Sequence, residues 1–112
     1  MKSENISDMV VEHILMRSNE ELAKITVQDI SNTLGMNPTH ISRTFRKDKK
    51  FPLSVYLVKL KVLRAASTLR QDNNITVAEL AKNMGFRTTG SFTRVFKQYF
   101  GASPDKFREY RR

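Results

Sequence analysis

The stretch ITVQDISNTLGM at residues 25–36 decides the fold, because the chain contains it twice. The second copy, ITVAELAKNMGF at residues 75–86, keeps the Ile, Thr, Val and Gly at an offset of 50, and its other apolar positions mostly correspond. After one inserted residue, ISRTFRK at residues 41–47 corresponds to FTRVFKQ at residues 92–98 at an offset of 51. An internal repeat of this kind predicts two copies of one supersecondary unit.

Each copy has the local pattern of a helix-turn-helix. A Thr that can cap a helix is followed three residues later by an acid, as in a capping box, at Thr26 and Asp29 and again at residues 76 and 79. Gly35 and Gly85 follow the last apolar residue, where a left-handed conformation ends a helix at low strain. A short capped helix, a Gly turn and a second helix together predict a helix-turn-helix.

Apolar residues recur at helical spacing along nearly the whole chain, and no strand pattern competes. The fold is therefore predicted to be all-α, with two helix-turn-helix subdomains at residues 1–52 and 72–112 joined by a long linker helix within residues 53–71. Ser7 is expected to cap the first helix, and Asn37-Pro38 to open the third. Seven helices are expected, at residues 7–17, 27–34, 37–48, 53–69, 77–84, 89–100 and 103–110. The apolar stripe of the linker helix is expected at Leu53, Tyr56, Leu57, Leu60, Leu63, Ala66 and Leu69.

Charge favours a polyanionic partner. Twenty Lys and Arg against eleven Asp and Glu give a net charge of +9, and the pI is near 10.2.

The absence of Cys excludes disulfides and thiolate sites. His13 and His40 have no acidic cluster at metal spacing, so we expect no metal, no cofactor and no enzymatic activity. No apolar run approaches the ~18 residues of a membrane span, and no signal peptide is visible, so the cytoplasm is the expected location.

The second helix of each repeat is the expected reader of double-stranded DNA. It would bury one stripe, with Ile41 and Phe45 or Phe92 and Phe96, and present the other stripe to the major groove. Arg suits bidentate contact with guanine, and Ser and Thr bond to bases or phosphates. The expected base contacts are Thr39, His40, Ser42, Arg43, Thr89, Ser91, Thr93 and Arg94. The expected backbone contacts are Arg46, Lys47, Lys49, Lys50, Arg87 and Lys97.

The linker helix is suited to separate the two readers. Recognition helices on one side of B-DNA lie about one helical turn, roughly 34 Å, apart. Residues 53–69 would span ~25 Å as a helix. A monomer could then occupy two successive major-groove segments.

The second repeat contains a stretch that resembles a known signature. It comprises Gly85-Phe86, Phe92-Thr93-Arg94-Val95-Phe96-Lys97, Phe100-Gly101-Ala102-Ser103-Pro104 and Phe107-Arg108. They are similar to the second repeat of the DNA-binding domain of the AraC/XylS family of bacterial transcription regulators. The resemblance covers about residues 7–110 and implies seven helices, two helix-turn-helix subdomains, a connecting helix, and a base-facing position at Gly90. The chain departs from the family pattern at Lys50, where Gly is usual, at Arg87-Thr88, and at Gly90-Ser91.

The resemblance also leads to expectations about domain context and partners. In the family, sensing and dimerisation often reside in a separate N-terminal domain. The chain is thus expected to be a stand-alone regulator or an excised fragment, monomeric by itself, with dimerisation through a missing domain. RNA polymerase is a further candidate partner. The alternatives are a basic module for an acidic protein partner, a nonspecific nucleic-acid binder, and an anionic-membrane binder. The membrane alternative is disfavoured because the core uses the apolar stripes.

Overall fold

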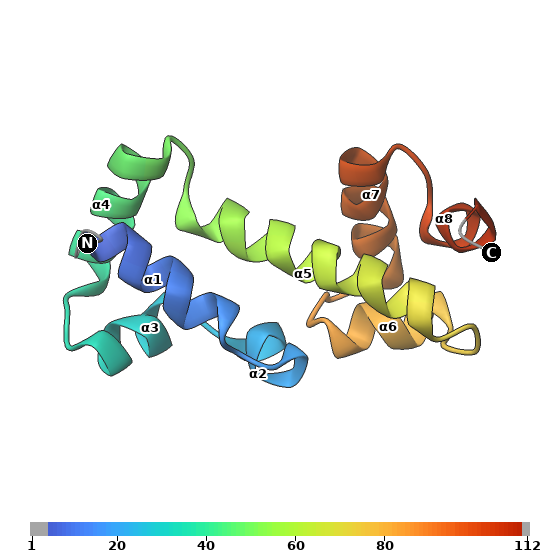
Figure 1. Cartoon of the computed structure of the whole chain (residues 1–112), viewed down its shortest axis with the longest axis horizontal. Coiled ribbons are helices and arrows are strands. Elements are labelled where there is room, and N and C mark those ends of the chain that lie inside the picture. The colour runs from blue at the N-terminus through green and yellow to red at the C-terminus, as the bar shows by residue number, and fades with distance from the viewer. Residues whose placement is uncertain (1–4, 111–112) are drawn as a thin grey trace. The chain divides into compact units, whose positions relative to one another are not determined.

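The computed structural model describes residues 5–110, and every regular element in that range is a helix (Figure 1). The all-α prediction is therefore confirmed for the described chain. None of its helices is both long enough and apolar enough to cross a membrane. The elements are α1 (Ile6–Leu15), α2 (Asn19–Lys24), α3 (Val27–Leu34), α4 (Pro38–Lys49), α5 (Leu53–Gln71), α6 (Val77–Asn83), α7 (Thr89–Phe100) and α8 (Pro104–Tyr110).

The expected number of seven helices is wrong, because residues 5–110 contain eight. The additional helix is α2, which follows directly after α1 and has six residues. Ser18 caps it, accepting from the N–H of Glu21, while the Glu21 carboxylate accepts from the Ser18 N–H at 2.9 Å. This backbone hydrogen bond lowers the pKa of Glu21. The Ser-x-x-Glu signal was present, but no Gly or Pro separates it from the preceding helix.

The expected cap at Ser7 is also wrong. Asn5 caps α1, and its side chain accepts from the Asp8 N–H at 2.9 Å. Ser7 lies inside the first turn of α1 and is fully buried. Both Asn and Ser are good capping residues, and the sequence alone did not decide between them.

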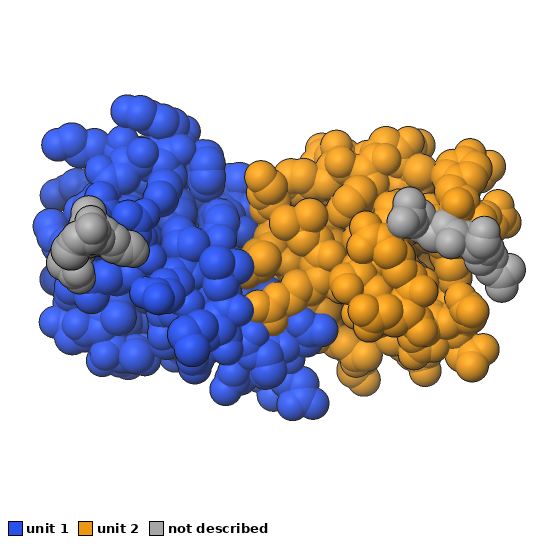
Figure 2. All heavy atoms as spheres, viewed as in Figure 1, with its two compact units in different colours: residues 1–57 blue, residues 58–112 orange. Residues whose placement is uncertain are grey.

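The chain forms two compact units, residues 1–57 and 58–112 (Figure 2). The boundary between them falls within α5. In the first unit, α4 packs against α1 and α3. Two aromatic rings also pack against Phe45. The centroid of its ring lies 5.9 Å from that of Phe51 and 5.8 Å from that of Tyr56. The core of this unit contains Val10, Ile14, Leu22, Ile30, Ile41, Phe45, Leu53 and Leu57.

The second unit has its own core, built where α6 packs against α7 and α7 against α8. Phe96 is central, with ring centroids 5.7 Å from Phe92, 4.6 Å from Phe100 and 5.3 Å from Phe107. The prediction that Phe92 and Phe96 are buried is confirmed, and Phe100 and Phe107 are partly buried against this core. The fully or nearly fully buried residues are Val62, Ala65, Ala66, Leu69, Leu80, Ala81, Met84, Phe92 and Phe96.

The end of the family signature, Phe107-Arg108, has a structural explanation. The Phe107 ring packs on the core, and the Arg70 guanidinium carbon lies 5.6 Å from its centroid. Arg108 donates from Nη1 to the carbonyl oxygen of Asn73 at 3.0 Å. The pair therefore ties α8 to the end of α5 and to the segment that leads into α6.

One part of the expected α5 stripe is wrong. Leu63 is 45% exposed, whereas Val62 and Ala65 are fully buried. The buried positions of α5 do not follow one stripe from end to end. Leu53, Leu57 and Leu60 are buried on the expected stripe, whereas the buried set from Val62 onward includes residues outside it. A single periodic pattern misses such a change of face.

Candidate nucleic-acid interface

The start of α4 is fixed by the predicted cap. The Asn37 side chain accepts from the N–H groups of Thr39 at 2.8 Å and His40 at 3.3 Å, and Pro38 occupies the first turn. These bonds satisfy donors that have no partner within the helix. Ile41 and Phe45 are fully buried, so they fix which side of α4 faces the core.

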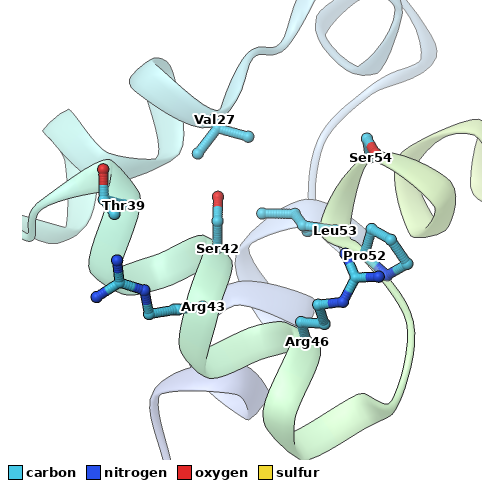
Figure 3. Close-up of a pocket in the computed structure, with 8 residues that line it drawn as sticks. All are labelled: Val27, Thr39, Ser42, Arg43, Arg46, Pro52, Leu53 and Ser54. Carbon is cyan, nitrogen blue, oxygen red and sulfur yellow. The ribbon is translucent and has the colours of Figure 1, made fainter.

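The opposite side of α4 presents four exposed polar side chains at helical spacing. Together with Val27 at the start of α3 and residues 52–54 at the start of α5, they line a hollow of about 360 Å³. In Figure 3 the Ser42 hydroxyl points toward Val27, and the two Arg side chains extend to either side of it. The four side chains are Thr39, Ser42, Arg43 and Arg46.

The other expected contacts on α4 lie outside this hollow. His40 and Lys47 are exposed. The Lys49 ammonium lies 2.9 Å from Asp8 Oδ1 of α1 and so has an acidic partner within the protein. Lys50 ends the helix with a left-handed backbone, φ 73°. The structure therefore brings four of the expected contact residues together in the hollow, and the other four lie outside it.

The start of α7 in the second unit is fixed by Thr88, whose hydroxyl oxygen accepts from the Ser91 N–H at 3.0 Å. This cap begins α7 at Thr89, where the sequence predicts the helix to begin. The Ser91 hydroxyl donates to the Thr88 carbonyl oxygen at 3.0 Å and is half-buried. Phe92 and Phe96 are fully buried and orient the helix as their counterparts do in α4.

The outer side of α7 repeats the pattern of α4 at an offset of 51. Ser42 corresponds to Thr93, and Arg43 to Arg94, which is exposed. The remaining pairs are Thr39 with Gly90 and Arg46 with Lys97. Thr93 is half-buried, and Thr89, Lys97 and the preceding Arg87 are exposed.

Sequence reasoning missed the contribution of α3 and α5 to the hollow beside α4. Val27, Pro52, Leu53 and Ser54 line it, and only long-range packing brings these segments to α4. No local pattern indicated this. Within residues 5–110, the structure has no group of three or more His, Cys, Asp or Glu that could hold a metal ion.

A helix-turn-helix domain family matches residues 30–110. The chain is also 33% identical over 107 residues to the probable transcription factor PqrA of Proteus vulgaris, covering 93% of this chain and 87% of that protein. The chain belongs to the AraC/XylS family. As a member of the AraC/XylS family it is a DNA-binding helix-turn-helix regulator of transcription.

This member of the AraC/XylS family is also similar to part of a longer regulatory protein and to a solved DNA-binding domain. The Msm operon regulatory protein of Streptococcus mutans is 29% identical over 87 residues, which are 78% of this chain and 31% of that protein. The solved DNA-binding domain of AdpA, in complex with a target DNA, has the same fold with a TM-score of 0.74. It is 23% identical, and the match covers 96% of this chain and 93% of that one.

Proposed function

We propose that α4 and α7 enter successive major-groove segments of one duplex and read sequence there. The observation that carries this proposal is the repeated exposed pattern, in which Arg43 and Arg94 occupy equivalent positions on the side opposite a fully buried pair of apolar residues. An Arg at such a position can bond to both acceptors of a guanine edge. The proposed role is binding rather than catalysis, by a monomer in the cytoplasm, with RNA polymerase as a further partner.

The proposed contacts fall into two classes. Side chains on the outer stripes and in the first turns of α4 and α7 meet base edges. Basic side chains farther along these helices, and Arg87 before α7, meet phosphates without reading sequence. The base set is Thr39, His40, Ser42, Arg43, Thr89, Ser91, Thr93 and Arg94. The backbone set is Arg46, Lys47, Lys49, Lys50, Arg87 and Lys97.

The two units are proposed to contribute unequally to specificity. Gly90 offers no side chain where α4 has Thr39, and the Ser91 hydroxyl already donates within its own turn. Thr93 is also less exposed than Ser42. We therefore expect α4 to carry more of the base discrimination and α7 to hold more of the DNA backbone.

The length of α5 suits this mode of binding. Its 19 residues correspond to roughly 28 Å of helix. Recognition helices on successive turns lie about 34 Å apart. A single helix of this length would bridge most of the distance between the two readers.

Selection from a random pool of duplex DNA tests the proposal. We expect an enriched motif with two parts, their centres about 10 base pairs apart, and with more information in the part bound by α4. A salt titration on the selected site should give a steep linear fall of log affinity with log salt concentration. A steep salt dependence with no enriched motif would instead indicate nonspecific nucleic-acid binding and overturn the proposal.

A further inference from the structure

Two consecutive residues at the start of α1 contact two consecutive residues at the end of α4. The Ser7 hydroxyl donates to Asp48 Oδ2 at 2.7 Å and lies 3.4 Å from the Thr44 carbonyl oxygen. The Lys49 ammonium lies 2.9 Å from Asp8 Oδ1. We name this set of contacts, formed by Ser7, Asp8, Asp48 and Lys49, the α1–α4 clasp.

The hydrogen bond is the stronger part of the clasp. Ser7 is fully buried, so its hydroxyl has no access to water as an alternative partner. A hydroxyl bound to a carboxylate is a charge-assisted bond, stronger than one between neutral groups. The ion pair is more exposed, with 32% of the Lys49 side chain and 50% of the Asp8 side chain accessible, and such pairs contribute little.

The clasp contacts α4 on the side opposite its outer stripe. Asp48 follows Thr39 by nine residues, which places the two about 180° apart around the helix axis. Ser7 therefore contacts the side of α4 that faces away from Thr39, Ser42 and Arg43. Because both attachments lie in the last turn of α4, they oppose rotation of the helix about its own axis, which would turn the outer stripe away from its target.

An acidic residue at position 48 is unfavourable both for α4 and for DNA binding. A negative charge near the end of a helix interacts unfavourably with the helix dipole. Its neighbours on α4 are basic, which suits a DNA-binding helix, whereas a carboxylate repels phosphates. The equivalent position of α7 is Tyr99, which is 42% exposed and has no carboxylate to offer. The acceptor that Asp48 provides for Ser7 explains its presence in α4.

We propose that Ser7 and Asp48 are positioning residues that set the orientation of α4, and with it the specificity of the first unit, without touching DNA. This rests on the proposed base reading by α4. If a shift of α4 displaces its bonds to base edges but leaves charge attraction to phosphates, loss of the clasp lowers affinity for the selected site and spares affinity for random DNA.

The first test compares Ser7→Ala with Ser18→Ala. Both variants lose one hydroxyl from the first unit, but the Ser18 hydroxyl caps α2, where its oxygen accepts from the Glu21 N–H at 3.1 Å. Affinities for the selected site and for random DNA are measured at a temperature where circular dichroism shows both variants folded. We expect Ser7→Ala to lower the ratio of specific to nonspecific affinity by about threefold to tenfold, and Ser18→Ala to leave it unchanged.

The second test varies the acceptor. Asp48→Asn and Asp48→Ala carry the same charge, but only the Asn side chain keeps an oxygen that can accept from Ser7. We expect Asp48→Asn to retain more of the specificity ratio than Asp48→Ala, and Ser7→Ala to have little further effect when added to Asp48→Ala. Equal ratios for Ser7→Ala and wild type, or additive losses in the double variant, would overturn the proposal. A wild-type chain that selects no motif would instead refute the base reading on which the clasp depends.

Discussion

Lys50 and Gly101 have the same backbone conformation at equivalent positions of the two repeats. Each has φ 73°, and each donates its N–H to the carbonyl oxygen four residues earlier, at 2.9 Å for Lys50 and 2.8 Å for Gly101. Among residues 5–110, Lys50 is the only non-Gly residue with positive φ. The first unit therefore ends its recognition helix with a left-handed residue that carries a side chain, at the position where the family usually has Gly.

Replacing Lys50 by Gly should stabilise the chain. The left-handed conformation destabilises a residue with a Cβ by about 1–2 kcal/mol, and Gly has no such penalty. The greater conformational freedom of Gly in the unfolded chain offsets part of this difference. We expect Lys50→Gly to raise the free energy of unfolding by about 1 kcal/mol in urea denaturation. Lys50→Ala is the control, because it removes the same charge and keeps the strain, and equal stability of the two variants would contradict this explanation.

Alanine at two glycines should change stability in opposite directions. A Cβ at Gly101 would meet no atom within 4 Å, so the expected loss of about 1 kcal/mol in Gly101→Ala comes from its positive φ alone. A Cβ at Gly90 also meets nothing within 4 Å, but this residue lies in the first turn of α7. We expect Gly90→Ala to stabilise by roughly 0.5–1 kcal/mol through helix propensity. Thermal denaturation of both variants checks the two signs.

The elements that sequence predicted well are those set by neighbouring residues. The capping boxes at Thr26 with Asp29 and at Thr76 with Glu79 both form as expected, with the two bonds of each box between 2.9 and 3.1 Å. Each involves residues three apart, so local chemistry decides it. The buried phenylalanines of α7 followed in the same way from helical spacing.

The features that sequence missed depend on contacts between distant segments. Ser7 reads as a cap, yet its hydroxyl binds Asp48, 41 residues away. Lys49, a proposed phosphate contact, is paired with Asp8, also 41 residues away, and no local pattern indicated this pairing. In both cases the residue type fits two roles, and only the packing of α1 on α4 shows which partner lies within reach.

Removing the Arg43 side chain should erase discrimination at one or two base pairs of the selected site. Arg43 is exposed beside Ser42 in the hollow of the first unit, and in the proposed complex it would contact a guanine edge. We expect Arg43→Ala to cost about 1–3 kcal/mol on the preferred sequence and little on sequences already altered at those positions. Arg94→Ala is the matched variant in the second unit, and its loss of discrimination should be smaller. Competition binding with single-base-pair variants of the site measures both, and uniform weakening by Arg43→Ala across all sequences would reassign Arg43 to the backbone.

Lys47 and Lys49 should differ in their contributions to the salt dependence of binding. Lys47 is exposed on α4, whereas the Lys49 ammonium is paired with Asp8. A lysine that contacts a phosphate releases a counterion, so Lys47→Ala should reduce the slope of log affinity against log salt concentration by about one. Lys49→Ala should reduce it by less, because the ammonium must leave its carboxylate partner to meet a phosphate, and the selected motif should stay the same for both. Salt titrations of the two variants on the same DNA site decide between them: a larger slope change for Lys49→Ala would show that DNA binding breaks the contact with Asp8.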